Sequence, residues 1–167
     1  MRNYKRVKYM DAIFKEKSIS STKQEFPSVF KQALKGFEII TGNQKSNNEE
    51  TVSIISTKLF EDIIDTAYKF NPVIEADEDG LGYTAALDEV MVFGDGDTLE
   101  EAFYDLSENL IEYAMLYLEK IDFYRQIENR KGHYPYLRRI IKCTNRNEVL
   151  EVILECRTDL QQAILKK

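Results

Sequence analysis

The chain has 167 residues, 43% of them hydrophobic, which is enough to bury a core in one domain or in two small ones. Seven Gly and three Pro argue against long disordered linkers, and two cysteines outside any C-x-x-C motif, beside a single His, predict reduced thiols and no structural zinc site. The basic N-terminus lacks the apolar stretch of a signal peptide, and no run approaches the roughly 20 apolar residues of a membrane span, so we expect a cytoplasmic protein.

The net charge of −6 is distributed unevenly along the chain. Residues 1–36 carry nine Lys/Arg and three Asp/Glu, and residues 120–167 carry eleven and six, whereas residues 71–119 carry fourteen Asp/Glu and no Lys or Arg. This segregation predicts a polyanion as partner for the basic ends and a basic surface as partner for the acidic middle. The alternative is that the carboxylates merely form one solvated helix face and some turns.

The first half of the chain predicts a strand and a helix, then a hairpin and a second helix. The expected ranges are a strand at 16–20, a helix from 21 or 22 to 34, strands at 37–41 and 51–56, and a helix at 57–70. Pro27 is tolerated in a first helical turn, so the first helix either begins near Phe26 or kinks there, and Gly36 is typical of a helix end. The apolar residues of this helix share one face: Phe26, Val29, Phe30, Ala33 and Leu34.

The next part of the chain predicts a β-meander followed by a long helix. Residues 72–79 alternate as a half-buried strand does, and two further strands are expected within 82–95. Thr98 and Glu101 have the spacing of a capping box, in which each side chain bonds to the backbone amide of the other residue. The helix that they begin is expected to end near Leu118.

Residues 120–167 predict a helical tail. Four basic residues, Arg138, Arg139, Lys142 and Arg146, surround its turn at 144–145. They can form a second DNA-binding element or a clamp for a toxin, or they can pack near the acidic middle of the same chain, and we favour the intramolecular packing.

No catalytic or cofactor site is expected. The chain lacks a P-loop, a G-x-G-x-x-G and an H-E-x-x-H motif, and its single histidine, His133, lies in a basic turn where a satisfied or exposed side chain is expected. The acidic turns leave one alternative, a metal-dependent hydrolase whose cation is held by Asp77, Asp79, Asp95 and Asp97. Their spacing departs from that of a calcium loop, and aspartates form turns by accepting local amide hydrogen bonds, so no metal is expected.

Residues 16–70 resemble the core of the Phd/YefM antitoxins, which is a strand, a helix, a β-hairpin and a helix. The resemblance rests on the stretch SSTKQEF, which begins at Ser20, followed by SVFKQALKG. It continues through the strands FEIIT and TVSIIS to the helix TKLFEDII.

Residues 73–115 resemble the half-barrel of the HicB antitoxins. The matching stretches are IEADEDGLGY and GDTLEEA, the second of which begins at Gly96. The family has a Pro-Glu-x-Pro-Gly stretch between them, where this chain has DEVMV.

The two resemblances together imply an α+β antitoxin of a type II toxin–antitoxin system, without catalysis and without a cofactor. They imply a Phd/YefM-like dimerisation and DNA-binding domain at 1–71, an acidic HicB-like β/α segment at 72–119 and a helical basic tail at 120–167. The expected partners are a second copy of the chain, operator DNA that the protein represses, and a ribonuclease-type toxin, either RelE-like or HicA-like. The alternative is a free-standing transcriptional regulator without a toxin.

Two sets of candidate binding residues follow from the charge pattern and the resemblance. Basic side chains that can release phosphate counterions on binding DNA are Arg2, Lys5, Arg6, Lys8, Lys15, Lys17 and Lys23. Side chains that can occupy the basic, RNA-binding surface of a toxin are Tyr83, Glu100, Glu101, Tyr104, Asp105 and Glu108.

Overall fold

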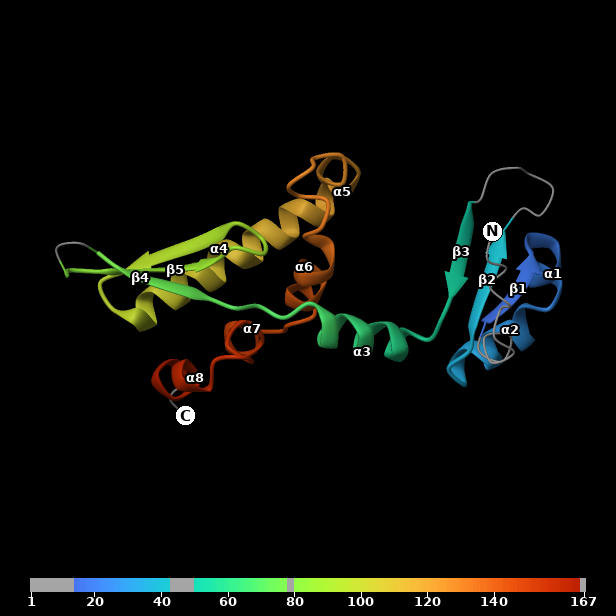
Figure 1. Ribbon diagram of the computed structural model, residues 1–167, viewed down its shortest axis with the longest axis horizontal. Coiled ribbons are helices and arrows are strands. Elements are labelled where there is room, and N and C mark those ends of the chain that lie inside the picture. Colours follow the sequence, from blue (N-terminus) through green and yellow to red (C-terminus); the bar gives the residue numbers. More distant parts are fainter. Residues whose placement is uncertain (1–13, 43–49, 78–79, 166–167) are drawn as a thin grey trace, which may run out of the picture. The chain divides into compact units, whose positions relative to one another are not determined.

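The computed structural model describes residues 14–42, 50–77 and 80–165, and within them the chain is α+β with two three-stranded sheets, as expected (Figure 1). The chain divides into two compact units, Met1–Ile63 and Ile64–Lys167, which are described here one at a time. None of the helices in the described residues is long and apolar enough to cross a bilayer.

The first unit is a small sheet with helices in the connection between its first two strands. Its strands are β1 (Phe14–Ser18), β2 (Glu38–Gly42) and β3 (Thr51–Ile54), in the order β1-β2-β3. β1 pairs in parallel with β2, and β3 returns antiparallel to β2. A parallel pair needs a crossover, which here contains α1 (Ile19–Gln24) and α2 (Phe26–Leu34).

The crossover contains two helices where the sequence predicted one. The Ser18 hydroxyl accepts a hydrogen bond from the amide of Ser21 at 3.1 Å and caps α1, so the expected helix start at 21 or 22 was wrong. Glu25 separates the helices, and Pro27 lies in the first turn of α2, where its missing N–H costs nothing. Gly36 follows α2 with a φ of +90°, which confirms the predicted helix end.

The core of the first unit is small and leaves much of α2 uncovered. Val29, Ala33 and Ile39 are buried and pack with Phe37 and Ile54. The other apolar residues on the predicted face of α2 remain largely exposed: Phe26 at 52%, Phe30 at 54% and Leu34 at 62%. An apolar row of this kind on a small unit marks a surface that can bind another protein.

The boundary between the two units falls within α3 (Thr57–Ala67). The second unit continues with an antiparallel meander of β4 (Val73–Ala76), β5 (Tyr83–Leu87) and β6 (Val92–Gly96). The long helix α4 (Leu99–Glu119) follows and packs on β5 and β6.

Two glycines bring α4 into backbone contact with β6. A Cβ at Gly94 would clash with the backbone N of Leu106, and a Cβ at Gly96 would lie 2.5 Å from the backbone N of Ala102. Both positions therefore need a residue without a side chain. Two glycines at alternate positions of one strand are the sequence signal of such a close approach.

The tail consists of α5 (Ile121–Tyr124), α6 (Tyr134–Ile141), α7 (Arg146–Ile153) and α8 (Thr158–Ile164), coloured orange to red in Figure 1. These helices contact α4, and the sheet, α4 and the tail share one hydrophobic core. The acidic segment and the basic tail thus form one unit, and α4 buries side chains along its whole length, from Ala102 to Tyr117.

Candidate functional site

The N-terminus of α4 is closed by the predicted capping box. The Thr98 hydroxyl accepts from the amide of Glu101 at 3.2 Å, and the Glu101 carboxylate accepts from the amide of Thr98 at 3.1 Å. Glu101, a candidate toxin-binding residue, therefore also stabilises the helix that carries the other carboxylates.

Asp105 holds the outer edge of β6. Its carboxylate accepts from the backbone amide of Asp95 and from the Asn109 side chain, both at 3.1 Å, and Asn109 in turn donates to the carbonyl of Phe93 at 3.0 Å. Side chains of α4 thus satisfy backbone groups on the free side of an edge strand, where another strand could otherwise pair. Asp105 is half-buried, and its carboxylate stabilises the contact between α4 and β6 whether or not it also binds a toxin.

A second row on α4 joins the acidic segment to the tail. The Tyr104 hydroxyl donates to Glu100 at 3.0 Å, and this bond to a carboxylate raises the pKa of Tyr104 above its usual value. Arg146 of α7 forms an ion pair with Glu108, and its guanidinium lies 5.3 Å from the centre of the Tyr104 ring. The tail cation Arg146 therefore packs against the acidic middle, in agreement with the intramolecular alternative.

The six predicted toxin-binding residues lie in three places. Glu100, Tyr104 and Glu108 follow one row of α4, and Glu101 and Asp105 lie beside the backbone of β6. Tyr83 lies on β5 opposite Gly96, with 39% of its surface exposed. Each of the five α4 residues has a hydrogen-bond or ion-pair partner within the unit, so a toxin would have to bind side chains that already make internal contacts.

The predicted DNA-binding residues are only partly described. Arg2, Lys5, Arg6 and Lys8 lie outside the described residues. Lys15 donates to the Gln32 side chain at 2.7 Å and lies 4.5 Å from the centre of the Phe37 ring, and Lys17 forms an ion pair with Glu25 at 2.7 Å. Lys23 is exposed on α1. Internal contacts therefore already engage Lys15 and Lys17.

The comparison with protein families decides the class of this protein. A family model described as PHD-like, "Antitoxin of toxin-antitoxin, RelE / RelB, TA system", matches residues 13–155. The chain belongs to this antitoxin family. It is thus the antitoxin of a toxin–antitoxin system, which implies a cognate toxin as partner.

A solved structure has the same fold as this antitoxin. It is the crystal structure of the antitoxin part of a proposed toxin/antitoxin system from Syntrophomonas wolfei subsp. wolfei. It matches with a TM-score of 0.65 at 19% sequence identity, covering 83% of this chain and 95% of that chain. No curated protein matches the antitoxin.

The acidic turns of the antitoxin do not form a metal centre among the residues that the structure describes. In residues 14–42, 50–77 and 80–165, no three His, Cys, Asp or Glu side chains gather as metal ligands would. Asp95 instead accepts from the Thr84 hydroxyl at 2.6 Å, while Asp79 lies outside the described residues. These observations give the metal-dependent hydrolase alternative no support.

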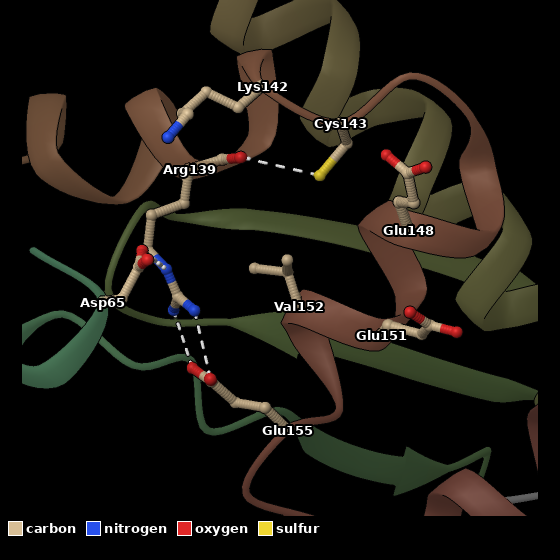
Figure 2. Close-up of a pocket in the computed structure, with 8 residues that line it drawn as sticks. All are labelled: Asp65, Arg139, Lys142, Cys143, Glu148, Glu151, Val152 and Glu155. Atoms are coloured by element: carbon tan, nitrogen blue, oxygen red, sulfur yellow. Dashed lines mark hydrogen bonds and ion pairs between the residues drawn. The ribbon is translucent and has the colours of Figure 1, made fainter. Parts of the chain in front are cut away.

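Arg139, which the sequence predicted only as one of four basic residues around a turn, is the centre of a buried polar cluster (Figure 2). The Arg139 side chain is only 7% exposed and donates to both carboxylate oxygens of Glu155, at 2.6 and 3.0 Å, to Asp65 at 3.1 Å and to the carbonyl of Tyr68 at 2.9 Å. Burial by itself would lower the pKa of Arg139, but the bonds to Glu155 and Asp65 raise it. The cluster connects α3, α6 and the segment after α7, and no short sequence motif could have revealed it.

In the pocket beside Arg139, neither the thiol nor the guanidinium is poised for catalysis. It has a volume of about 360 Å³ and is also lined by Lys142, Cys143 and Glu148. Burial raises the pKa of the Cys143 thiol, which keeps it protonated and poorly nucleophilic at neutral pH. The guanidinium of Arg139 is already occupied by two carboxylates, so it is not free to bind an anion.

His133 is a buried structural residue of the antitoxin. Its Nδ1 is hydrogen-bonded to the Tyr113 hydroxyl at 2.7 Å, and its ring stacks at 6.4 Å on Tyr117. Burial, and then the nearby charge of Arg130, lower the pKa of His133, so the ring is neutral at pH 7. The sequence predicted that this histidine would be either hydrogen-bonded or exposed, and the structure confirms the hydrogen-bonded alternative.

Proposed function

We propose that this antitoxin neutralises a ribonuclease-type toxin by direct binding through its second unit, dimerises through its first unit and represses its own operon. The observation that carries the proposal is the acidic surface of the second unit. Residues 71–119 contain no Lys or Arg, and Glu101, Glu108 and Glu112 are exposed along α4. A toxin that binds RNA has a basic surface, which such carboxylates attract and orient.

The first unit supports the homodimer. Phe26, Phe30 and Leu34 repeat every four residues along α2 and are each more than half exposed. Contact with a second copy would remove this apolar row from water, which favours a dimer. The row fits the Phd/YefM-like role that the sequence predicted for residues 1–71.

Operator binding rests on the basic N-terminal residues together with Lys23. Because Lys15 and Lys17 have internal partners, we assign the phosphate contacts to Lys23 and to the predicted residues Arg2, Lys5, Arg6 and Lys8. Such contacts position a protein on DNA, and the dimer would place two sets of them on the two halves of an operator.

The direct test uses the purified full-length antitoxin, the toxin encoded by the adjacent gene and a duplex of the promoter DNA. We expect stoichiometric binding of the toxin in isothermal titration calorimetry, loss of its ribonuclease activity, and a shift of the promoter duplex that weakens as salt is added. Promoter binding without toxin binding would instead support the free-standing regulator. Absence of both interactions would contradict the proposal.

The acidic contribution is tested by the salt dependence of the association rate. Replacing Glu108 and Glu112 with Gln is expected to slow toxin association several-fold at low salt and to have less effect at high salt. Glu101 and Asp105 are unsuitable for this test, because their neutralisation would remove the helix cap and a bond to β6. Glu128→Gln, at a carboxylate 88% exposed in the tail, is the matched control.

A further inference from the structure

The sheet of the second unit has a face that α4 leaves open. Gly94 and Gly96 of β6 face α4, so the alternate residues Phe93 and Asp95 point to the opposite side. The strand register places four more residues on that side, and we call the set the outer face: Val73, Glu75, Thr84, Ala86, Phe93 and Asp95. Phe93 is 59% exposed and Val73 is 39% exposed, so solvent reaches this face in the unit.

The outer face consists of an apolar row beside an acidic row. The register places Val73 opposite Ala86, and Ala86 opposite Phe93, so these three side chains cross the sheet side by side. Two residues further along each strand, and therefore about 7 Å away, Glu75, Thr84 and Asp95 form the second row. Glu75 and Asp95 are exposed, and the Thr84 hydroxyl fixes the Asp95 carboxylate at 2.6 Å.

The strands that form this face contribute no cation to it. Residues 71–119 contain no Lys or Arg, and the exposed Asp88 directly follows the last residue of β5. Arg157 approaches the start of β4, where it donates to the carbonyl of Pro72, but its guanidinium is also bonded to Asp159 at 2.8 and 3.1 Å. The outer face is therefore an apolar strip with negative charge beside it.

This charge selects among the partners that could cover the strip. A nucleic acid would be repelled by Glu75 and Asp95. A second copy of the same face would bring carboxylates close to carboxylates, and like charges placed opposite each other are destabilising. A protein surface with apolar side chains and adjacent Lys or Arg residues complements both rows.

We propose that the outer face docks the cognate toxin through a basic patch of the toxin with an apolar centre. This inference rests on the proposed function, since it assumes that the toxin binds the second unit. The apolar row, above all the ring of Phe93, supplies affinity, and the acidic row supplies orientation and association rate. Docking uses the face of the sheet, because Asp105 and Asn109 already occupy backbone groups at the edge of β6 and oppose the addition of a strand.

The test measures binding of the full-length antitoxin to the purified toxin encoded by the adjacent gene. Phe93→Thr keeps a residue that favours strands and removes the ring, and it is expected to raise the Kd at least about tenfold, mainly through faster dissociation. Glu75→Gln is expected to slow association several-fold at low salt. The matched controls are Met115→Ala, at an apolar residue 62% exposed on α4, and Glu128→Gln, at a carboxylate 88% exposed in the tail, and both are expected to bind the toxin with little change.

Hydrogen exchange of the unchanged antitoxin provides a second measurement that does not depend on the folding of a variant. Toxin binding is expected to slow exchange of the backbone amides of β4 and β6. If the antitoxin binds the toxin but shows neither slowed exchange nor a response to Phe93→Thr and Glu75→Gln, the outer face is not the docking site and the proposed function stands.

Two other outcomes overturn the inference in different ways. Failure of the unchanged antitoxin to bind the toxin would contradict the proposed function and the docking site together. A dimer that Phe93→Thr converts to a monomer would show that the outer face joins two copies of the chain.

Discussion

Two glycines in β6 determine how closely α4 approaches the sheet. Any Cβ at Gly94 would meet the backbone of Leu106, and the neighbouring contact at Gly96 is with Ala102. Backbone atoms cannot move aside as the end of a flexible side chain can, so a methyl group at either position must separate the helix from the strand.

Gly94→Ala is therefore expected to lower the free energy of unfolding by about 3 kcal/mol or more, since it overpacks a site with no space. Urea denaturation followed by circular dichroism measures the change. Gly132→Ala is the matched control, because a Cβ at Gly132 would have no atom within 4 Å. Equal stability of the two variants would mean that α4 does not rest on β6 as described.

The buried ring of His133 makes stability depend on pH. Its pKa is lowered in the folded state, so the folded chain resists a proton that the unfolded chain takes up near its ordinary pKa of about 6.5. The stabilising contribution is complete above pH 6.5 and is lost as the pH falls through and below that value.

We expect the free energy of unfolding to fall by at most about 1.4 kcal/mol per pH unit between pH 6.5 and the lower pKa of the folded state, and His133→Gln to remove most of this dependence. Urea denaturation at pH 7.5, 6.5 and 5.5 measures the slope. The chain has a single His, so the titration of its ring by NMR gives the folded pKa directly. A folded pKa at or above 6.5 would contradict this account.

Local capping bonds set where several helices begin. Ser18 caps α1, Asn145 caps α7 by accepting from the amide of Glu148 at 3.0 Å, and the capping box at Thr98 begins α4. α4 is the element most affected by its cap, because the sheet and the tail both pack on this helix.

Thr98→Ala is expected to lower the free energy of unfolding by about 1 kcal/mol, because it leaves the amide of Glu101 without its acceptor. Thr98→Ser keeps the hydroxyl and is expected to be nearly neutral. Denaturation of both variants in urea compares them. A similar loss in both would show that the methyl group of Thr98, rather than the cap, stabilises the helix.

The molecule as a whole separates its surfaces between two units. The first unit exposes an apolar row on α2, and the second exposes carboxylates along α4 and on the outer face. This separation matches the two kinds of contact that we propose, one between copies of the chain and one with a basic partner.

Phe30→Glu tests the first of these contacts. Because Phe30 is 54% exposed, the substitution is expected to preserve the fold and to weaken the proposed homodimer by at least about tenfold in dissociation constant. Size-exclusion chromatography with light scattering over a range of concentrations measures the dissociation. Val52→Glu, at another exposed apolar residue of the first unit, is the control, and a monomeric unchanged antitoxin would contradict the prediction.

The sequence by itself determined what depends on neighbours within about one helical turn. It predicted the α+β class, the meander, the capping box at Thr98 and the helix end at Gly36, because capping bonds, turns and hydrophobic periodicity act over a few residues. The predicted antitoxin class, which the family comparison confirms, likewise rested on contiguous stretches such as GDTLEEA.

Only the tertiary structure decided which residues meet across the chain. Arg139 bonds to Asp65 over 74 positions, and Asp105 and Asn109 hold β6 from α4. It also showed that Lys15 and Lys17 have internal partners, which the charge pattern could not reveal. These outcomes depend on which faces of helices and strands pack together, and that choice is made by burial of the whole core rather than by any local pattern.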